Sequence, residues 1–308
     1  MIHCILQNRI FKILFCLGLM MFIVTATLAQ QSSIPKGGDN TIPTSINARF
    51  EHIAFNVLDP VAMAKWYTDN LGMKVMRSGP APAFTTFIAD SGKHMMFELT
   101  HNTNAPLFEP SKIHFTSIHL AFFTPDIKQM QAQLTAAGAR IVDSLRTTSS
   151  GDIVITLRDP WGLAIQFVQR MKPMLNFAGL YPEHFAINVA DSREKAQWYA
   201  DHLGMIVMRD GKAPSYGMFI ADASKNMMYE LYQNKDVPVV DFSTVNPMSF
   251  HVAYIVDNIQ AAKDILVAAG AKVVEDVTTL PSGDTVLILR DPWNQPIQFV
   301  NRVQPMIK

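Results

Sequence analysis

An internal duplication constrains this chain more than any other feature. Residues 51–100 align without a gap on residues 183–232 at an offset of 183 − 51 = 132, and 28 of the 50 aligned pairs are identical. The same offset brings residues 157–170 onto residues 289–302. Self-similarity over such lengths indicates a tandem pair of related structural units rather than one irregular domain.

The duplication predicts the domain organisation. The two halves are residues 48–171 and 180–303, joined by a linker at residues 172–179. With 308 residues and 49% hydrophobic content, the chain is long enough to build two cores of ordinary size. Basic and acidic residues each number 26, so the balanced charge gives no electrostatic reason to expect nucleic acid as a partner.

The segment before the first half has the features of an export signal. Arg9 and Lys12 precede an apolar run, and the small residues around Ala29 suit cleavage after that residue. We therefore expect a signal peptide at residues 1–29, a polar linker at residues 30–47, and export to the periplasm or out of the cell. The apolar run is shorter than the ~20 residues that span a bilayer comfortably, so an uncleaved anchor is the weaker alternative and no stable membrane insertion is expected after cleavage.

Each half contains a smaller repeat of about 67 residues, because residues 52–55 resemble residues 119–122 and 119 − 52 = 67. Alternating and helical patterns predict the order strand, helix and three strands (βαβββ) for each such module. The first module is predicted to have a strand at 52–57, a helix at 62–70 and strands at 74–77, 85–90 and 94–100. The second is predicted to have a strand at 117–123, a helix at 127–137 and strands near 140–146, 153–158 and 163–169. The fold class is therefore α+β, with four βαβββ modules.

Candidate metal ligands lie on the sheet face away from the helix, because the other face must be apolar to cover the helix. Their spacings match between the halves: 98 − 52 = 230 − 184 = 46, and 166 − 119 = 298 − 251 = 47. The candidates are His52, Glu98, His119, Gln166, His184, Glu230, His251 and Gln298. Of the nine histidines in the chain, only the four in this list have a histidine at the aligned position of the other half. Imidazole, carboxylate and amide ligands suit a divalent transition metal (Zn, Ni, Co, Mn or Fe) rather than Ca²⁺.

Several further polar and aromatic residues also face inward and are interpreted mainly as structural. They are Asn56, Asn188, Phe87, Phe219, Arg158 and Arg290. Each arginine precedes an Asp-Pro turn, so we expect it to pair with the aspartate that follows it.

The chain resembles the vicinal oxygen chelate (VOC) superfamily of glyoxalases, bleomycin-resistance proteins and extradiol dioxygenases. The features that carry the resemblance are the paired modules, the strand-borne His52 and His119, the strands around Glu98 and Glu230, and the Asp-Pro-Trp-Gly turn at residues 159–162. The resemblance covers roughly residues 48–303. It implies that two modules form one cupped, incomplete barrel, with ligands from the first and last strand of each module. By position, the resemblance groups His52, Glu98, His119 and Gln166 in one half and His184, Glu230, His251 and Gln298 in the other. The sequence leaves open whether modules pair within a half or exchange partners.

The resemblance implies a metal-dependent lyase or isomerase that acts on a small molecule with vicinal oxygens. Glyoxalase I, the acyl-CoA epimerases and the extradiol dioxygenases resemble one another in having glutamate in the last strand, where this chain has Gln166 and Gln298. Glutamine cannot act as a general base, so Glu98 and Glu230 are the expected catalytic residues. An Fe²⁺ extradiol-type dioxygenase and a non-catalytic small-molecule binding protein of the bleomycin-resistance type are the alternatives. Substrate and oligomeric state are not readable from the sequence.

Overall fold

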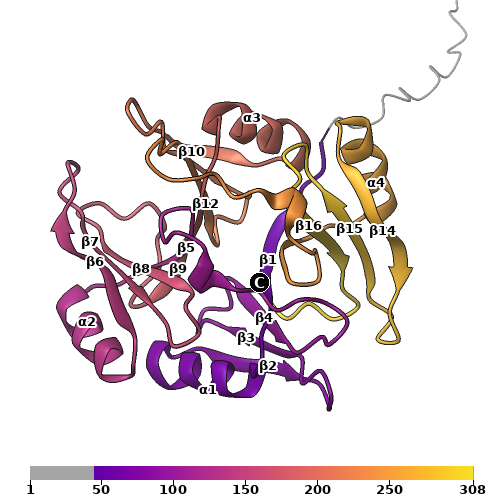
Figure 1. Ribbon diagram of the computed structural model, residues 1–308. Helices are drawn as coiled ribbons and strands as arrows, with labels where there is room; N and C mark the ends of the chain where they lie inside the picture. The colour runs from indigo at the N-terminus through magenta and orange to yellow at the C-terminus, as the bar shows by residue number, and fades with distance from the viewer. Residues whose placement is uncertain (1–44, 308) are drawn as a thin grey trace, which may run out of the picture. The chain divides into compact units, whose positions relative to one another are not determined.

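The structure is a computed structural model that describes residues 45–307 (Figure 1). The expected signal peptide and nearly all of the expected polar linker lie outside the described residues. Within the described part, no helix is long and apolar enough to cross a membrane.

All four modules have the predicted βαβββ order. The first contains β1 (Arg49–Asn56), α1 (Pro60–Leu71), β2 (Lys74–Ser78), β3 (Thr86–Ala89) and β4 (Met96–Thr100). The second contains β5 (Ile118–Phe123), α2 (Ile127–Ala136), β6 (Arg140–Thr147), β7 (Ile153–Arg158) and β8 (Ala164–Gln169). The third contains β9 (Tyr181–Asn188), α3 (Ser192–Leu203), β10 (Ile206–Asp210), β11 (Met218–Ala221) and β12 (Met228–Tyr232). The fourth contains β13 (Phe250–Ile255), α4 (Ile259–Ala268), β14 (Lys272–Thr279), β15 (Thr285–Arg290) and β16 (Pro296–Asn301). Two short 3₁₀ helices, Pro110–Lys112 and Phe242–Thr244, precede β5 and β13.

Local sequence sets the ends of the helices. At α1, the Asp59 side chain accepts a hydrogen bond from the Ala62 amide and Pro60 takes the first helical position. Gly72 ends the same helix in the left-handed region with φ 64°, where a residue without a Cβ is favoured. Asp191 and Gly204 repeat this arrangement around α3. Each helix is thereby fixed at a defined point after the first strand of its module.

The strands form two eight-stranded sheets, and each sheet contains strands from both halves. The first has the order β14-β15-β16-β13-β1-β4-β3-β2, and the second has the order β10-β11-β12-β9-β5-β8-β7-β6. In Figure 1 the indigo β1 therefore shares a sheet with the yellow β15 and β16 from the other end of the chain. Module one pairs with module four, and module two with module three. The grouping of ligands within each half, which the resemblance implied, is wrong on this point, and the exchange of partners is what the structure shows.

Modules of the same half remain in contact through their helices. The Tyr67 hydroxyl of α1 donates to Asp159 Oδ2 at 2.9 Å, and Trp66 Nε1 donates to the Ala137 carbonyl at 2.8 Å. Tyr199 and Trp198 of α3 make the equivalent bonds to Asp291 and Ala269. The two sheets share one apolar core that includes Phe97, Phe122, Phe185 and Phe299. Residues 48–171 and 180–303 are thus repeats in sequence, whereas each sheet joins one module from each.

The segment expected to be a plain linker, residues 172–179, is in part packed. Leu175 is only 2% exposed and lies in a cluster with Tyr181, Phe219 and Met228. Ile307, which follows the second half at the same offset, packs in a matching cluster with Phe87 and Met96. Because Phe219 and Phe87 sit on the sheet faces that carry the candidate ligands, these two apolar segments cover part of each of those faces.

We expect Leu175→Ala to lower the free energy of unfolding by about 2–5 kcal/mol, because the substitution leaves a cavity where a buried leucine packed. Met171→Ala is the matched control, since Met171 in the adjoining stretch is 76% exposed, and its effect should stay within about 0.5 kcal/mol. Urea unfolding followed by circular dichroism measures both. Equal, small effects would mean that the segment does not pack in solution.

Candidate metal centres

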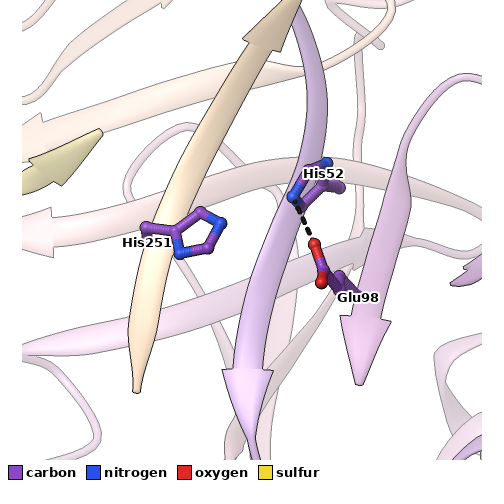
Figure 2. A group of neighbouring side chains, drawn as sticks. All are labelled: His52, Glu98 and His251. Carbon is purple, nitrogen blue, oxygen red and sulfur yellow. Dashed lines mark ion pairs between the residues drawn. The ribbon is translucent and has the colours of Figure 1, made fainter. Parts of the chain in front are cut away.

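The first centre is made by His52 of β1, Glu98 of β4 and His251 of β13, whose ligand atoms all lie within 4.8 Å of one another. Glu98 and His251 both align with Ala54, from opposite sides of β1, so the sheet register brings the three side chains to one face. Figure 2 shows His52 and Glu98 pointing toward each other, with His251 on the neighbouring strand. Module four thus supplies a residue that the first half lacks at this centre.

The second centre repeats the first with the modules exchanged. It contains His184 of β9, Glu230 of β12 and His119 of β5, again with ligand atoms within 4.8 Å. Glu230 and His119 both align with Ala186 of β9. Each centre therefore holds two histidines from one antiparallel strand pair and a glutamate from the next strand.

The residues present fit a divalent metal ion. His52 Nε2 lies 2.9 Å from Glu98 Oε2, and His184 Nε2 lies 3.1 Å from Glu230 Oε2. The Nε2 atoms of His251 and His119 are buried without a hydrogen-bond partner among the described residues, and those of His52 and His184 face only the glutamate carboxylates. Such unpaired buried nitrogens are costly, and a shared cation would satisfy them.

The Nδ1 atom of His52, which points away from the first centre, is held by a buried row of charged side chains. Glu51 Oε2 lies 2.8 Å from His52 Nδ1, and Arg302 donates two hydrogen bonds, both 2.7 Å, to the two Glu51 oxygens. Arg302 also contacts Asp284 at 3.1 Å. Carboxylates in this position fix the orientation of a metal-binding imidazole and raise its basicity. His52 is therefore aimed at the centre through Nε2.

The second centre has the same row of charged side chains, made by Glu183, Arg170 and Asp152. Glu183 Oε2 lies 2.8 Å from His184 Nδ1, and Arg170 contacts Glu183 at 2.6 Å and Asp152 at 2.9 Å. Sequence reasoning missed all six residues of these two charged rows. The signal was available in the duplication, because 183 − 51 = 302 − 170 = 284 − 152 = 132.

The electrostatic environment differs between the two histidines of each centre. Burial lowers the pKa of His52, but the Glu51 and Glu98 carboxylates outweigh burial, so the net shift of this pKa is upward. Burial, together with the charge of His52, lowers the pKa of His251 to about 4. His184 and His119 show the same pair of shifts, and the pKa of His119 also falls to about 4. His251 and His119 are therefore neutral near pH 7, with a lone pair free to bind a metal ion.

The two glutamines lie on strands next to the histidine strands. Gln298 of β16 aligns with Ala253, two residues after His251 on β13, so the sheet register places it beside the first centre. Gln166 of β8 aligns with Ala121 of β5, at the matching position beside the second centre.

The other inward candidates have structural partners. The Asn56 amide donates to carbonyls of the 102–106 loop, and its Oδ1 accepts from the Asn102 amide. The expected pairing of Arg158 with Asp159 is not found: Arg158 donates to backbone carbonyls, including that of Pro110, while Asp159 accepts from a tyrosine and from turn amides. Arg290 likewise donates to carbonyls, including that of Phe242. A guanidinium group can donate hydrogen bonds to several carbonyls at once. Each of these arginines therefore holds the loop before β5 or β13 in place and does not pair with the aspartate that follows it.

We expect Glu51→Gln to weaken metal binding at the first centre by about 10–100-fold, because the His52 imidazole loses its carboxylate partner. The second centre provides the internal control, since its own Glu183 is untouched. Competition with a fluorescent chelator measures the two affinities separately. Equal weakening at both centres would mean that the substitution acts through general unfolding, and no weakening would remove the orienting role of Glu51.

Together, the fold and the side-chain groups define a protein of four βαβββ modules whose sheets carry two candidate metal centres, each made of two histidines and a glutamate. Residues 49–167 match the Glyoxalase/Bleomycin resistance protein/Dioxygenase superfamily, and residues 184–300 match a Glyoxalase-like domain. The chain belongs to this superfamily, in which it is a tandem member.

Several proteins of similar sequence or structure are lactoylglutathione lyases, also called glyoxalase I. Lactoylglutathione lyase of Arabidopsis thaliana is 24% identical over 270 residues, which cover 81% of this chain and 90% of that protein. Lactoylglutathione lyase of Haemophilus influenzae is 28% identical over 123 residues, 38% of this chain and 89% of that protein. The structure of glyoxalase I from Zea mays has a TM-score of 0.66 at 20% identity and covers 82% of this chain and 92% of that one. The structural likeness shows the fold, and the sequence relatives support the expectation of a glyoxalase-type lyase.

Proposed function

We propose that this protein is a divalent-metal-dependent lyase or isomerase of glyoxalase type with two centres per chain, acting on a small molecule that carries two neighbouring oxygens. The observation that carries the proposal is the pair of equivalent groups, each with two histidines and one glutamate, in which the buried Nε2 atom of His251 or His119 lacks a hydrogen-bond partner among the described residues. The ion is a transition metal such as Zn²⁺, Ni²⁺, Co²⁺, Mn²⁺ or Fe²⁺, because imidazole ligands favour these ions.

The glutamates are the residues that can move a proton. The Glu98 and Glu230 side chains are 20% and 18% exposed, whereas the side chains of His52 and His184 beside them are at most 1% exposed. Each carboxylate therefore has one side on the metal centre and one side open to a small molecule. When bound, the ion would polarise a substrate carbonyl and stabilise negative charge on its oxygen. Glu98 or Glu230 would then take the proton from the adjacent, hydroxyl-bearing carbon and return it to the former carbonyl carbon, while the hydroxyl proton passes to the former carbonyl oxygen, so that the carbonyl and hydroxyl groups exchange places.

The names of the sequence relatives suggest the first substrate to test. Metal-loaded protein, chelator-treated protein and the reloaded sample are compared for formation of lactoylglutathione from glutathione and methylglyoxal. Metal-dependent turnover supports the proposal. Tight metal binding without turnover on this adduct or on other α-hydroxycarbonyl compounds would contradict it, and O₂ uptake with catechols by the iron-loaded protein would favour a dioxygenase. A protein that binds no metal would be left as a small-molecule binding protein.

The proposal includes export through the predicted signal peptide at residues 1–29. Expression of the full chain in a bacterial host, followed by N-terminal sequencing of the protein from the periplasm and the medium, tests it. An exported chain that begins near Gln30 supports export, and a chain that stays in the cytoplasm with residues 1–29 intact contradicts it.

A further inference from the structure

Arg209 lies beside the second centre but is not one of the residues that orient its histidines. Arg209 of β10 aligns with Phe219 of β11, and Phe219 aligns with Glu230 of β12. Directly opposed residues of antiparallel strands place their side chains on one face, so Arg209, Phe219 and Glu230 form a row that leads to the metal centre. The Arg209 guanidinium carbon lies 4.0 Å from the centre of the Phe219 ring, which in turn meets the His184 ring edge-on at 5.3 Å.

The first centre has the same row. Arg77 of β2 aligns with Phe87 of β3, which aligns with Glu98 of β4, and the Arg77 guanidinium carbon lies 4.7 Å from the centre of the Phe87 ring. Arg77 is 44% exposed, and its nearest carboxylate, that of Asp284, is 3.8 Å away. The duplication has therefore kept an arginine stacked on an aromatic ring at both centres.

The inner arginines of the same faces behave differently. Arg170, whose guanidinium carbon lies 5.7 Å from the centre of the same Phe219 ring, is 7% exposed and pairs with Glu183 and Asp152. Arg209 is exposed, and across residues 45–307 no carboxylate oxygen comes within ion-pair distance of it. The inner arginine is thus fully used in orienting a histidine, while the N–H groups of the outer one remain available to a ligand.

We propose that Arg209 and Arg77 bind an anionic oxygen group of the substrate, so that the molecule held at each metal centre carries a carboxylate or phosphate besides its two neighbouring oxygens. The inference rests on the proposed function and adds the charge of the substrate to it. Stacking on Phe219 or Phe87 fixes the plane of the guanidinium and leaves its N–H edge free to form two parallel hydrogen bonds with an oxyanion. An arginine so positioned discriminates by charge and by geometry, which lysine cannot reproduce.

Hydroxamates test the inference directly, because they bind metal ions through two neighbouring oxygens. Butanohydroxamic acid is neutral beyond its metal-binding group, succinic monohydroxamic acid has a carboxylate in place of the terminal methyl group, and 3-phosphonopropanohydroxamic acid has a phosphonate there. Isothermal titration calorimetry of zinc-loaded protein with each probe gives the affinities without any need for turnover. We expect one or both of the anionic probes to bind about 10-fold or more tightly than the neutral probe, and the stronger of the two identifies the oxyanion.

The variants isolate the two arginines. Arg77→Met/Arg209→Met should bring the affinity of the anionic probes down to that of the neutral probe, with zinc content and neutral-probe affinity unchanged. Arg77→Lys/Arg209→Lys should keep only part of the advantage. Arg193→Met is the matched control, because Arg193 also stacks on an aromatic ring, that of Tyr216, at 4.9 Å but pairs with Asp210 on the exposed surface. Arg193→Met should retain the full advantage.

The outcomes separate this inference from the function on which it rests. Equal binding of neutral and anionic probes by the unmodified protein, or an advantage that survives Arg77→Met/Arg209→Met, overturns the inference and leaves the metal-dependent function standing. Binding of no probe by zinc-loaded protein overturns the proposed function and the inference with it.

Discussion

His52→Ala and His251→Ala should each remove the same metal ion, although 251 − 52 = 199 residues separate the two histidines in the sequence. Each single variant is expected to retain about one ion per chain, because the group around His184 is untouched and a centre that loses one of its histidine ligands binds its ion far more weakly. The double variant His52→Ala/His251→Ala should lose no more than either single variant. Metal content after dialysis, measured by plasma mass spectrometry, gives the count.

The converse pair provides the decisive comparison. His52→Ala/His119→Ala should remove both ions, because the exchanged modules place these two histidines in different centres. If modules paired within each half in solution, this double variant would lose one ion and His52→Ala/His251→Ala would lose two. His114→Ala serves as the control, since His114 is exposed and its ring bonds to Thr116, and it should keep both ions.

The sequence was sufficient to predict the modules and the faces of their strands. The helix predicted at residues 62–70 is α1, Pro60–Leu71, and the strand predicted at residues 52–57 is β1, Arg49–Asn56. The predicted alternation is also confirmed, because Ile53 and Phe55 lie in the core while His52 points to the opposite face. These features follow from local patterning and capping, which a single sequence contains in full.

Pairing between modules could not be predicted in the same way. β1, β5, β9 and β13 have nearly the same alternating pattern, and burial of one face fixes the register of a strand without naming its partner. The structure contains long-range contacts within each half, such as the hydrogen bond from Tyr67 of α1 to Asp159, and strand alternation carries no signal for such contacts. The resemblance therefore grouped His52 with His119, whereas the structure brings His52 together with His251.

The buried carboxylates behind the histidines escaped prediction for a different reason. Strict alternation would put Glu51 on the face opposite His52, but the pairing of β1 with β13 shifts register between Phe50 and His52. The same irregularity occurs in β9, where the pairing with β5 passes over Glu183. A β-bulge re-aims a side chain in this way, and period-two patterning contains no signal for it.

The double variant Glu98→Gln/Glu230→Gln should lower kcat by about 10²–10⁴-fold on a substrate that the unmodified protein turns over, because it removes the proposed general base from both centres. Metal content should not change, since the amide oxygen of glutamine can still bind the ion. Either single variant leaves one intact centre and should lose only the share of turnover that belongs to the altered one. Glu194→Gln, at the exposed first turn of α3, is the control and should retain full activity. Full turnover by the metal-loaded double variant would show that another group moves the proton, whereas loss of both metal and activity would show that the glutamates act mainly as ligands.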